Sequence, residues 1–191
     1  MQKRLLSEWI AIAGLSGDAR QTAAGATDAR SLAEKLSRAH PEDAVRFLAH
    51  LLPNREGVLW AWSCAKSAAP GDASALLRAS LAATEKWIAQ PNDENRRAAM
   101  SAAQEAEVGT PAGAAGLAAF LSGESLAPPG AHPVLPAEHL ASKAVAASIM
   151  LSAVSSEPEK APAKYREFLM RGFELAQRTH LWESAALAGT E

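Results

Sequence analysis

The side chains that most often carry catalysis lie far apart in this sequence, and none has an obvious helper nearby. Cys64, the single cysteine, follows Ser63, but no base stands close to either residue in the sequence. A lone cysteine in an apolar helix is usually an inert small side chain, so we predict no nucleophilic catalysis. The histidines show neither the His-x-x-x-His nor the His-Glu-x-x-His spacing of metal sites, and we therefore expect neither a metal nor another cofactor. We assign the first histidine to a helix start and the others to the surface or to loops; they are His40, His50, His132, His139 and His180.

A glycine-containing run, Gly109–Gly116, looks at first like a phosphate-binding loop. It lacks the Gly-Lys-Ser/Thr ending of such loops, and no predicted strand precedes it. We instead expect Gly113 and Gly116, which stand three residues apart, to let two helices cross closely, because a residue without a side chain leaves room for a neighbouring backbone.

The richest segment is 52–66, which places an Arg/Glu pair and two tryptophans on one predicted helix. Trp60 and Trp62 lie about 200° apart on a helical wheel, so they face nearly opposite ways. Either neighbouring helices enclose this helix on both sides, or one tryptophan is exposed and available to a partner. Arg55 shares a stripe with Trp62, and both residue types are enriched at interface hot spots. The alternative keeps both indoles in the core and pairs Arg55 and Glu56 with neighbouring helices.

Arg96 is a second cation near the start of a helix, at the edge of that helix's apolar face. A cation in this position needs a carboxylate, and Asp93 stands three residues earlier. We therefore expect a structural ion pair with Asp93 rather than an anion-binding site. Glu56 is a conceivable long-range partner of the same guanidinium.

Residues 123–136 cannot form a helix, because four prolines fall within nine positions. We read this proline-rich segment as a crossover loop between the early helices and the last pair. Its polyproline character also makes it a candidate recognition arm, centred on Pro128 and Pro129.

The elements around these residues are predicted to be helical. Alanine, leucine, glutamate and lysine favour helices, whereas the aromatic residues that strands favour make up only 5%. The chain is long enough for one domain with a substantial core. We predict a single all-α domain over residues 1–191, with about eight helices packed as antiparallel hairpins and a flexible tail over 180–191. Expected helices include 3–13, 29–39, 73–90, 137–155 and 163–179.

Charge and hydropathy narrow the classes of partner. A net charge of −2 gives no basic footprint for phosphates, so we expect no nucleic-acid binding. The most apolar segment, 144–154, is too short to cross a bilayer, which takes about 20 residues. The N-terminal stretch resembles a signal peptide, but Ser7 and Glu8 interrupt its apolar run, so we read it as an amphipathic helix. Together with the single cysteine, this predicts a cytoplasmic protein without membrane insertion.

Several motifs, taken in order, resemble one uncharacterised, alanine-rich, helical bacterial family that is often encoded in type VI secretion gene clusters. The resemblance spans about residues 15–180 and implies a secretion context without an established activity. Its longest motifs are Asp-Ala-Val-Arg-Phe-Leu-Ala-His-Leu-Leu-Pro-Asn-Arg-Glu at 43–56, Pro-Asn-Asp-Glu-Asn-Arg-Arg-Ala-Ala-Met at 91–100 and Ser-Leu-Ala-Pro-Pro at 125–129. Elements that recur in the family are, in this chain, Pro53, Arg55, Glu56, Trp60, Cys64, Trp87, Asn95, Arg96 and the segment 126–129.

These observations favour a non-enzymatic protein–protein interaction protein, such as an accessory, adaptor or loading factor of a type VI secretion system. Two alternatives stay open. One is a small-ligand binder or enzyme with a pocket between helices lined by Trp60, Trp87, Arg96 and Glu56. The other is an immunity protein that masks a toxin. The expected partner-binding residues are Arg55, Glu56, Trp60, Trp62, Asn95, Arg96, Pro128 and Pro129.

Overall fold

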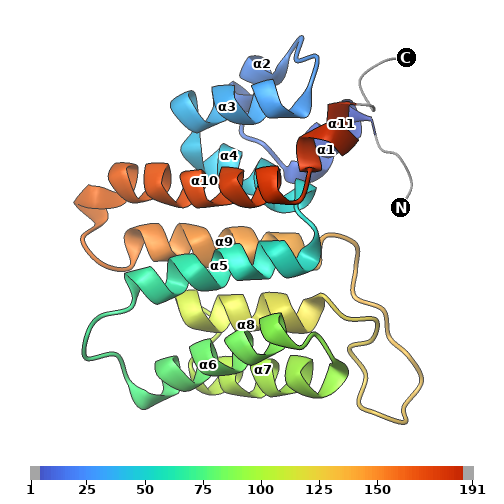
Figure 1. Cartoon of the computed structure of the whole chain (residues 1–191), viewed down its shortest axis with the longest axis vertical. Helices are drawn as coiled ribbons and strands as arrows, with labels where there is room; N and C mark the ends of the chain where they lie inside the picture. The colour runs from blue at the N-terminus through green and yellow to red at the C-terminus, as the bar shows by residue number, and fades with distance from the viewer. Residues whose placement is uncertain (1–4, 187–191) are drawn as a thin grey trace.

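The computed structural model describes residues 5–186, and this part of the chain is helical without a β-strand (Figure 1). The predicted all-α class is therefore confirmed. Residues 1–4 and 187–191, which include the start of the predicted helix 3–13 and the end of the predicted tail, lie outside the described residues. The α-helices are α1 (Leu6–Ala13), α2 (Gly17–Ala23), α3 (Ala29–Ala39), α4 (Pro41–Leu51), α5 (Asn54–Ala68), α6 (Ala75–Ala89), α7 (Asp93–Glu105), α8 (Pro111–Leu121), α9 (Leu140–Val154), α10 (Ala161–Arg178) and α11 (Leu181–Ala186), and a short 3₁₀ helix (Pro158–Lys160) precedes α10.

Side-chain caps fix where many of these helices begin. Asp28 accepts a hydrogen bond from the amide of Ser31 at 2.8 Å and starts α3, whose bounds agree with the predicted 29–39. Asn92 and Thr110 cap α7 and α8 in the same way. Each cap satisfies an amide that has no partner inside the helix, which is why these residue types mark helix starts in the sequence.

The described residues contain eleven α-helices, more than the expected eight, because short helices escape a periodicity argument. The helix α2 has only seven residues, and Ser16 caps it by accepting from the amide of Ala19. The helix α11 lies within 180–191, the segment that we expected to be a flexible tail, and the flexibility of that tail stays a prediction. The Trp182 ring packs 6.0 Å from the ring of Phe173 on α10, and this apolar contact keeps the segment helical.

The helices pack around α9, which lies in the middle of the molecule beside α5, α8 and α4 (Figure 1). The pair α6 and α7 covers α8 at one end, and α10 covers α4, α5 and α9. Contacts therefore join helices far apart in sequence as well as consecutive ones. The connection from α8 to α9, drawn in yellow to orange, extends to one side of the bundle before the chain returns to its centre.

Small residues let these helices approach closely. A Cβ at Gly116 would lie 2.9 Å from the Cβ of Ala103, so the glycine brings α8 against α7. This supports the predicted close crossing at Gly116, whereas Gly113 lies against the backbone of Glu107 in the turn before α8. Within the described part of the chain, no helix is both long enough and apolar enough to cross a membrane.

Candidate functional site

The two tryptophans of α5 point to opposite neighbours, as their spacing predicted. Trp60 is 0% exposed, and its Nε1 donates a 2.7 Å hydrogen bond to the carbonyl oxygen of Phe168 on α10. Trp62 is half-buried, and its Nε1 donates to the carbonyl oxygen of Leu81 on α6 at 3.0 Å. Neighbouring helices therefore enclose α5 on both sides. Trp60, which we expected to contact a partner, lies instead in the core.

Arg55 is exposed, but it also serves the fold. Its Nε donates to the carbonyl oxygen of Ile88 at 2.8 Å and satisfies an acceptor near the end of α6. Glu56 is half-buried and lines a small hollow of about 240 Å³ together with Arg55 and Arg178. Among the described residues, Arg96 forms its ion pair with Asp93 and not with Glu56, the conceived long-range partner.

Asn95 and Arg96 are both interior residues. Asn95 is 2% exposed, and its Nδ2 donates to the carbonyl oxygen of Gln90 at 2.9 Å. Arg96 is 4% exposed, and its Nη2 lies 2.5 Å from Asp93 Oδ1, which confirms the ion pair expected from the spacing. Both side chains, which we expected on a contact surface, lie instead in the interior and bind within the protein.

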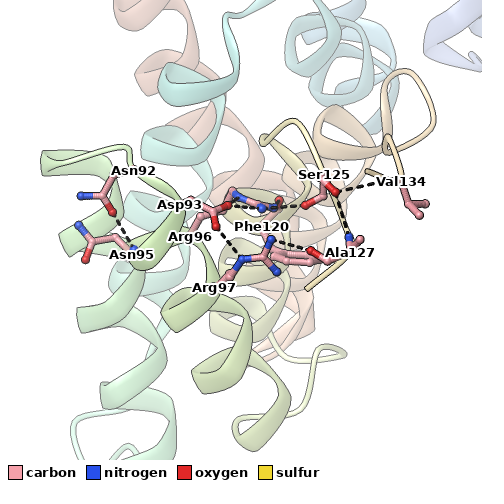
Figure 2. Close-up of polar contacts among 9 residues, drawn as sticks. All are labelled: Asn92, Asp93, Asn95, Arg96, Arg97, Phe120, Ser125, Ala127 and Val134. Carbon is pink, nitrogen blue, oxygen red and sulfur yellow. Dashed lines mark hydrogen bonds and ion pairs between the residues drawn. The ribbon is translucent and has the colours of Figure 1, made fainter. Parts of the chain in front are cut away.

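The Arg96 guanidinium instead holds the proline-rich segment (Figure 2). Its Nη1 donates to the carbonyl oxygen of Phe120 and its Nη2 to that of Ser125, both at 2.7 Å. Arg97, the next residue, donates from Nη2 to the carbonyl oxygen of Ala127 at 2.7 Å. Sequence reasoning paired Arg96 with a carboxylate and missed that both arginines also bind backbone of the loop.

One carboxylate joins the two arginines. Asp93 accepts from Arg97 Nε at 2.7 Å through one oxygen and from Arg96 through the other. The hydrogen bonds from Arg97 and Arg96 hold the pKa of Asp93 below its ordinary value. The carboxylate therefore stays ionised and keeps both guanidinium groups directed toward the loop.

The loop itself is a closed structure with an exposed tip. The amide of Leu126 donates to the carbonyl oxygen of Val134 at 2.7 Å, and this bond brings the two sides of the loop together. Within the tip, the amide of Ala131 donates to the carbonyl oxygen of Pro128 at 3.1 Å, and Gly130 has φ +81°. Proline followed by glycine at positive φ is the signature of a type II turn.

The loop exposes apolar side chains at its turn and at its closing side. Pro128 and Pro129 are exposed, as a recognition arm requires, and so are Val134 and Leu135, the latter to 73%. We did not single out Val134 and Leu135 from the sequence, although two large apolar residues between prolines were a signal. We name Pro128, Pro129, Val134 and Leu135 the apolar tip.

A cavity of about 520 Å³ lies between α7 and the loop. Trp87 and Arg96 line it, as the ligand-pocket alternative expected, but Trp60 and Glu56 do not. Its arginines already donate to Asp93 and to loop carbonyls, so their charge is largely compensated.

Two residues considered for catalysis or metal binding, Cys64 and His50, are buried. Cys64 is buried, and burial raises the pKa of its thiol to about 12. His50 is only 5% exposed, so its assignment to the surface or a loop is wrong: the last turn of α4 directs it inward. Within residues 5–186, no three His, Cys, Asp or Glu side chains gather in an arrangement that can hold a metal ion.

Comparisons with known proteins place the chain by family alone. No curated protein and no solved structure matches it. One family model matches residues 31–176, a range that contains α4 to α9, both arginines that hold the loop and the loop itself. The chain therefore belongs to DUF6931, a family of unknown function.

Proposed function

We propose that this protein is a non-enzymatic protein–protein interaction protein, and that the apolar tip of its proline-rich loop is the contact surface. One observation carries the proposal: two arginines of α7 and a closing backbone bond fix a loop whose tip exposes large apolar side chains. Contiguous exposed apolar surface often marks an interaction site, and here the buried Arg96 holds the loop that exposes it.

The geometry suits recognition because the loop is already ordered. A segment that becomes ordered only on binding loses conformational entropy, and this loss lowers its affinity. A segment that is already fixed avoids the loss. Prolines reduce the freedom of the free chain further. The tip therefore resembles the prearranged side of an interface, and it fits an apolar groove on a partner.

The partner context rests on the resemblance found in the sequence. A family often encoded in type VI secretion clusters supports an accessory, adaptor or loading factor of such a system, acting in the cytoplasm. The segment 126–129, which recurs in that family, forms one side of the loop. The burial of Cys64 and the raised pKa of its thiol favour a role without catalysis.

The test is affinity capture from a bacterium that encodes a type VI system, followed by mass spectrometry. The double variant Val134→Ser/Leu135→Ser should lose the captured protein while its circular dichroism and urea midpoint stay as in the wild type. Leu76→Ser is the matched control, because Leu76 is 48% exposed on α6, far from the loop in sequence. Equal capture by the double variant and the wild type would remove the apolar tip as the contact surface.

Two further outcomes separate the alternatives. If Arg55→Ala loses the partner and the loop variant keeps it, the contact lies on α5 instead. If the captured protein is a toxin encoded next to this chain, and the chain blocks its activity, the protein is an immunity protein.

A small-ligand role has one observation in its favour, the cavity of about 520 Å³ beside Trp87 and Arg96. This volume lies in the usual range of small-molecule sites, about 300–1,000 Å³. A ligand bound there would protect Trp87 from a fluorescence quencher, and a Trp87→Phe variant would lose that signal.

A further inference from the structure

His50 carries a buried polar atom that the protein leaves without a partner. Its Nδ1 lies 2.8 Å from the carbonyl oxygen of Arg46. A carbonyl can only accept, so Nδ1 carries the proton of this bond, and Nε2 of the neutral ring carries a lone pair. Among all buried side-chain nitrogen and oxygen atoms of the described residues, His50 Nε2 is the one without a hydrogen-bond partner.

The ring stays neutral, so the lone pair is preserved. Burial is the main cause that lowers the pKa of His50, and the charges of His139 and Lys143 act in the same direction. The hydrogen bond to Arg46 opposes this shift without cancelling it. A buried acceptor without a donor is costly, and native proteins usually supply the donor from protein, water or a ligand.

His50 lines a hollow of about 730 Å³ between the end of α4, the start of α9 and the end of the proline-rich loop. Most of its walls are apolar or aromatic, with a few polar groups among them. This combination of a largely apolar lining and few polar groups is typical of small-molecule sites. The wall residues that matter below are Trp9 and His139.

Two further rings stand beside His50. The His139 ring centroid lies 5.5 Å from that of His50, with the planes tilted by 44°, and the Trp9 ring lies 6.2 Å from that of His139 in an edge-on arrangement. His139 occupies the left-handed region at φ +65°, directly before α9. Rings at such separations already pack against one another, and all three also line the hollow, so a flat group in the hollow would meet this aromatic wall from outside.

We propose that this hollow binds a flat aromatic group carrying an O–H or N–H donor, and that His50 Nε2 accepts its hydrogen bond. The site is separate from the apolar tip, so it goes beyond the proposed function and does not depend on it. The group can be a free small phenol or the tyrosine side chain of a partner, which share this chemistry.

The test follows the His50 Nε2 signal by long-range ¹H–¹⁵N correlation in the full-length, ¹⁵N-labelled protein. Phenol should move this signal upfield, because an accepted hydrogen bond draws on the lone pair. Anisole has the same ring but a methyl ether in place of the O–H, and it should leave the signal in place. A larger shift with N-acetyl-tyrosinamide than with phenol identifies a partner's side chain as the source, and the reverse identifies a free small molecule.

Variants make the test specific. His50→Phe keeps a ring in the wall and removes Nε2, so phenol should no longer perturb the amide signals of α9. His132→Phe changes an exposed histidine of the loop and should behave like the wild type. If His50→Phe does not fold, His139→Ala removes one neighbouring ring and should weaken the effect of phenol on the intact His50.

Three results would overturn the proposal. Phenol and anisole can shift the His50 signal equally, which would make the hydrogen bond irrelevant. The Nε2 signal can already stand at its hydrogen-bonded position and ignore phenol, which would mean a trapped water only. Finally, Zn²⁺ alone can shift both His50 and His139 while phenol shifts neither, which would make the pair a metal site.

Discussion

Arg96 reaches from α7 to the carbonyl oxygen of Ser125, 29 residues later in the chain, and donates to it at 2.7 Å. The guanidinium is 4% exposed, so its hydrogen bonds are made in a place where water cannot replace them. Gly123 allows this approach, because a Cβ at that position would collide with the Arg96 side chain. The shape of the loop is therefore set by a residue of another helix.

Replacing Arg96 should weaken both the fold and the loop. Arg96→Met keeps most of the side-chain volume but removes the donors to Phe120, Ser125 and Asp93. The two carbonyl groups and the Asp93 carboxylate then each lose a charge-assisted bond from a buried donor, and we expect the free energy of unfolding to fall by about 3 kcal/mol. Urea denaturation followed by circular dichroism measures the loss.

Arg97→Met is the matched control. The Arg97 side chain is 25% exposed and makes one bond to the loop, so water can replace part of what it loses. We expect a loss of about 1 kcal/mol for this variant. Equal losses for the two variants would contradict the central role that the structure gives to Arg96.

The sequence predicted the near partner of Arg96 but not the far ones. Asp93 lies one helical turn away, and such pairs follow from spacing alone. The carbonyls of Ser125 and Ala127 belong to a loop whose path depends on how α8 turns back, and carbonyl acceptors carry no mark of residue type. The position of Arg96 at the edge of an apolar face therefore indicated a buried hydrogen bond, but it did not identify the acceptors.

Gly172 on α10 should resist substitution although alanine favours helices. A Cβ there would lie 2.7 Å from both Leu48 Cδ2 and Trp60 Cζ2, inside the core. Overpacking of this kind costs about 1–3 kcal/mol, against a helix-propensity gain of about 1 kcal/mol. We expect Gly172→Ala to lower the melting temperature measured by circular dichroism.

Gly17→Ala provides the comparison, because Gly17 begins α2 with open space around it. We expect this variant to match the wild type or to gain about 0.4–1 kcal/mol. If Gly172→Ala were as stable as Gly17→Ala, the side chains of Trp60 and Leu48 would move aside at little energetic cost.

Burial of polar residues was harder to predict than helix positions. Periodicity and capping residues predicted α3 at its observed bounds, since both are local signals. His50 falls in the last turn of α4, where a polar residue is ordinarily exposed, and only the packing of α9 and α1 beside α4 buries it. The helical wheel correctly predicted that Trp60 and Trp62 face opposite ways. It did not predict that α10 and α6 cover the two sides of α5.

Asp43 should make stability depend on acid pH. Burial raises the pKa of Asp43, but the hydrogen bonds from Ser16 and the Arg46 charge together outweigh burial and hold the pKa below the ordinary value of 3.8. A lowered pKa gives stability that is present above the ordinary pKa and is lost as pH falls through the folded one. We expect urea midpoints to fall as pH drops from about 5 through the folded pKa of Asp43, which lies below 3.8, and to fall less in Asp43→Asn.

Ser16→Ala tests the same contact from the other side. The Ser16 hydroxyl donates to Asp43 Oδ2 at 2.8 Å, and its amide donates to Oδ1 at 2.9 Å. The variant removes only the hydroxyl, so it should keep part of the acid dependence. If the double variant Ser16→Ala/Asp43→Asn loses as much free energy of unfolding as the two single variants summed, Ser16 and Asp43 are not coupled in the way the structure indicates.

Cys64 should be inert while the protein is folded. Burial raises the pKa of its thiol to about 12, so almost no thiolate, the reactive form, is present at about pH 8. A thiol reagent such as 5,5′-dithiobis(2-nitrobenzoic acid) should therefore modify the native protein only as fast as the protein unfolds. The same reagent should modify the urea-unfolded protein at once. The Cys64→Ser variant gives the blank. Because the folded pKa is raised, this thiol also supports stability below its ordinary pKa of 9.0 and loses that contribution as pH rises toward 12. Rapid stoichiometric labelling of the native protein would contradict the buried position and reopen a nucleophilic role for Cys64.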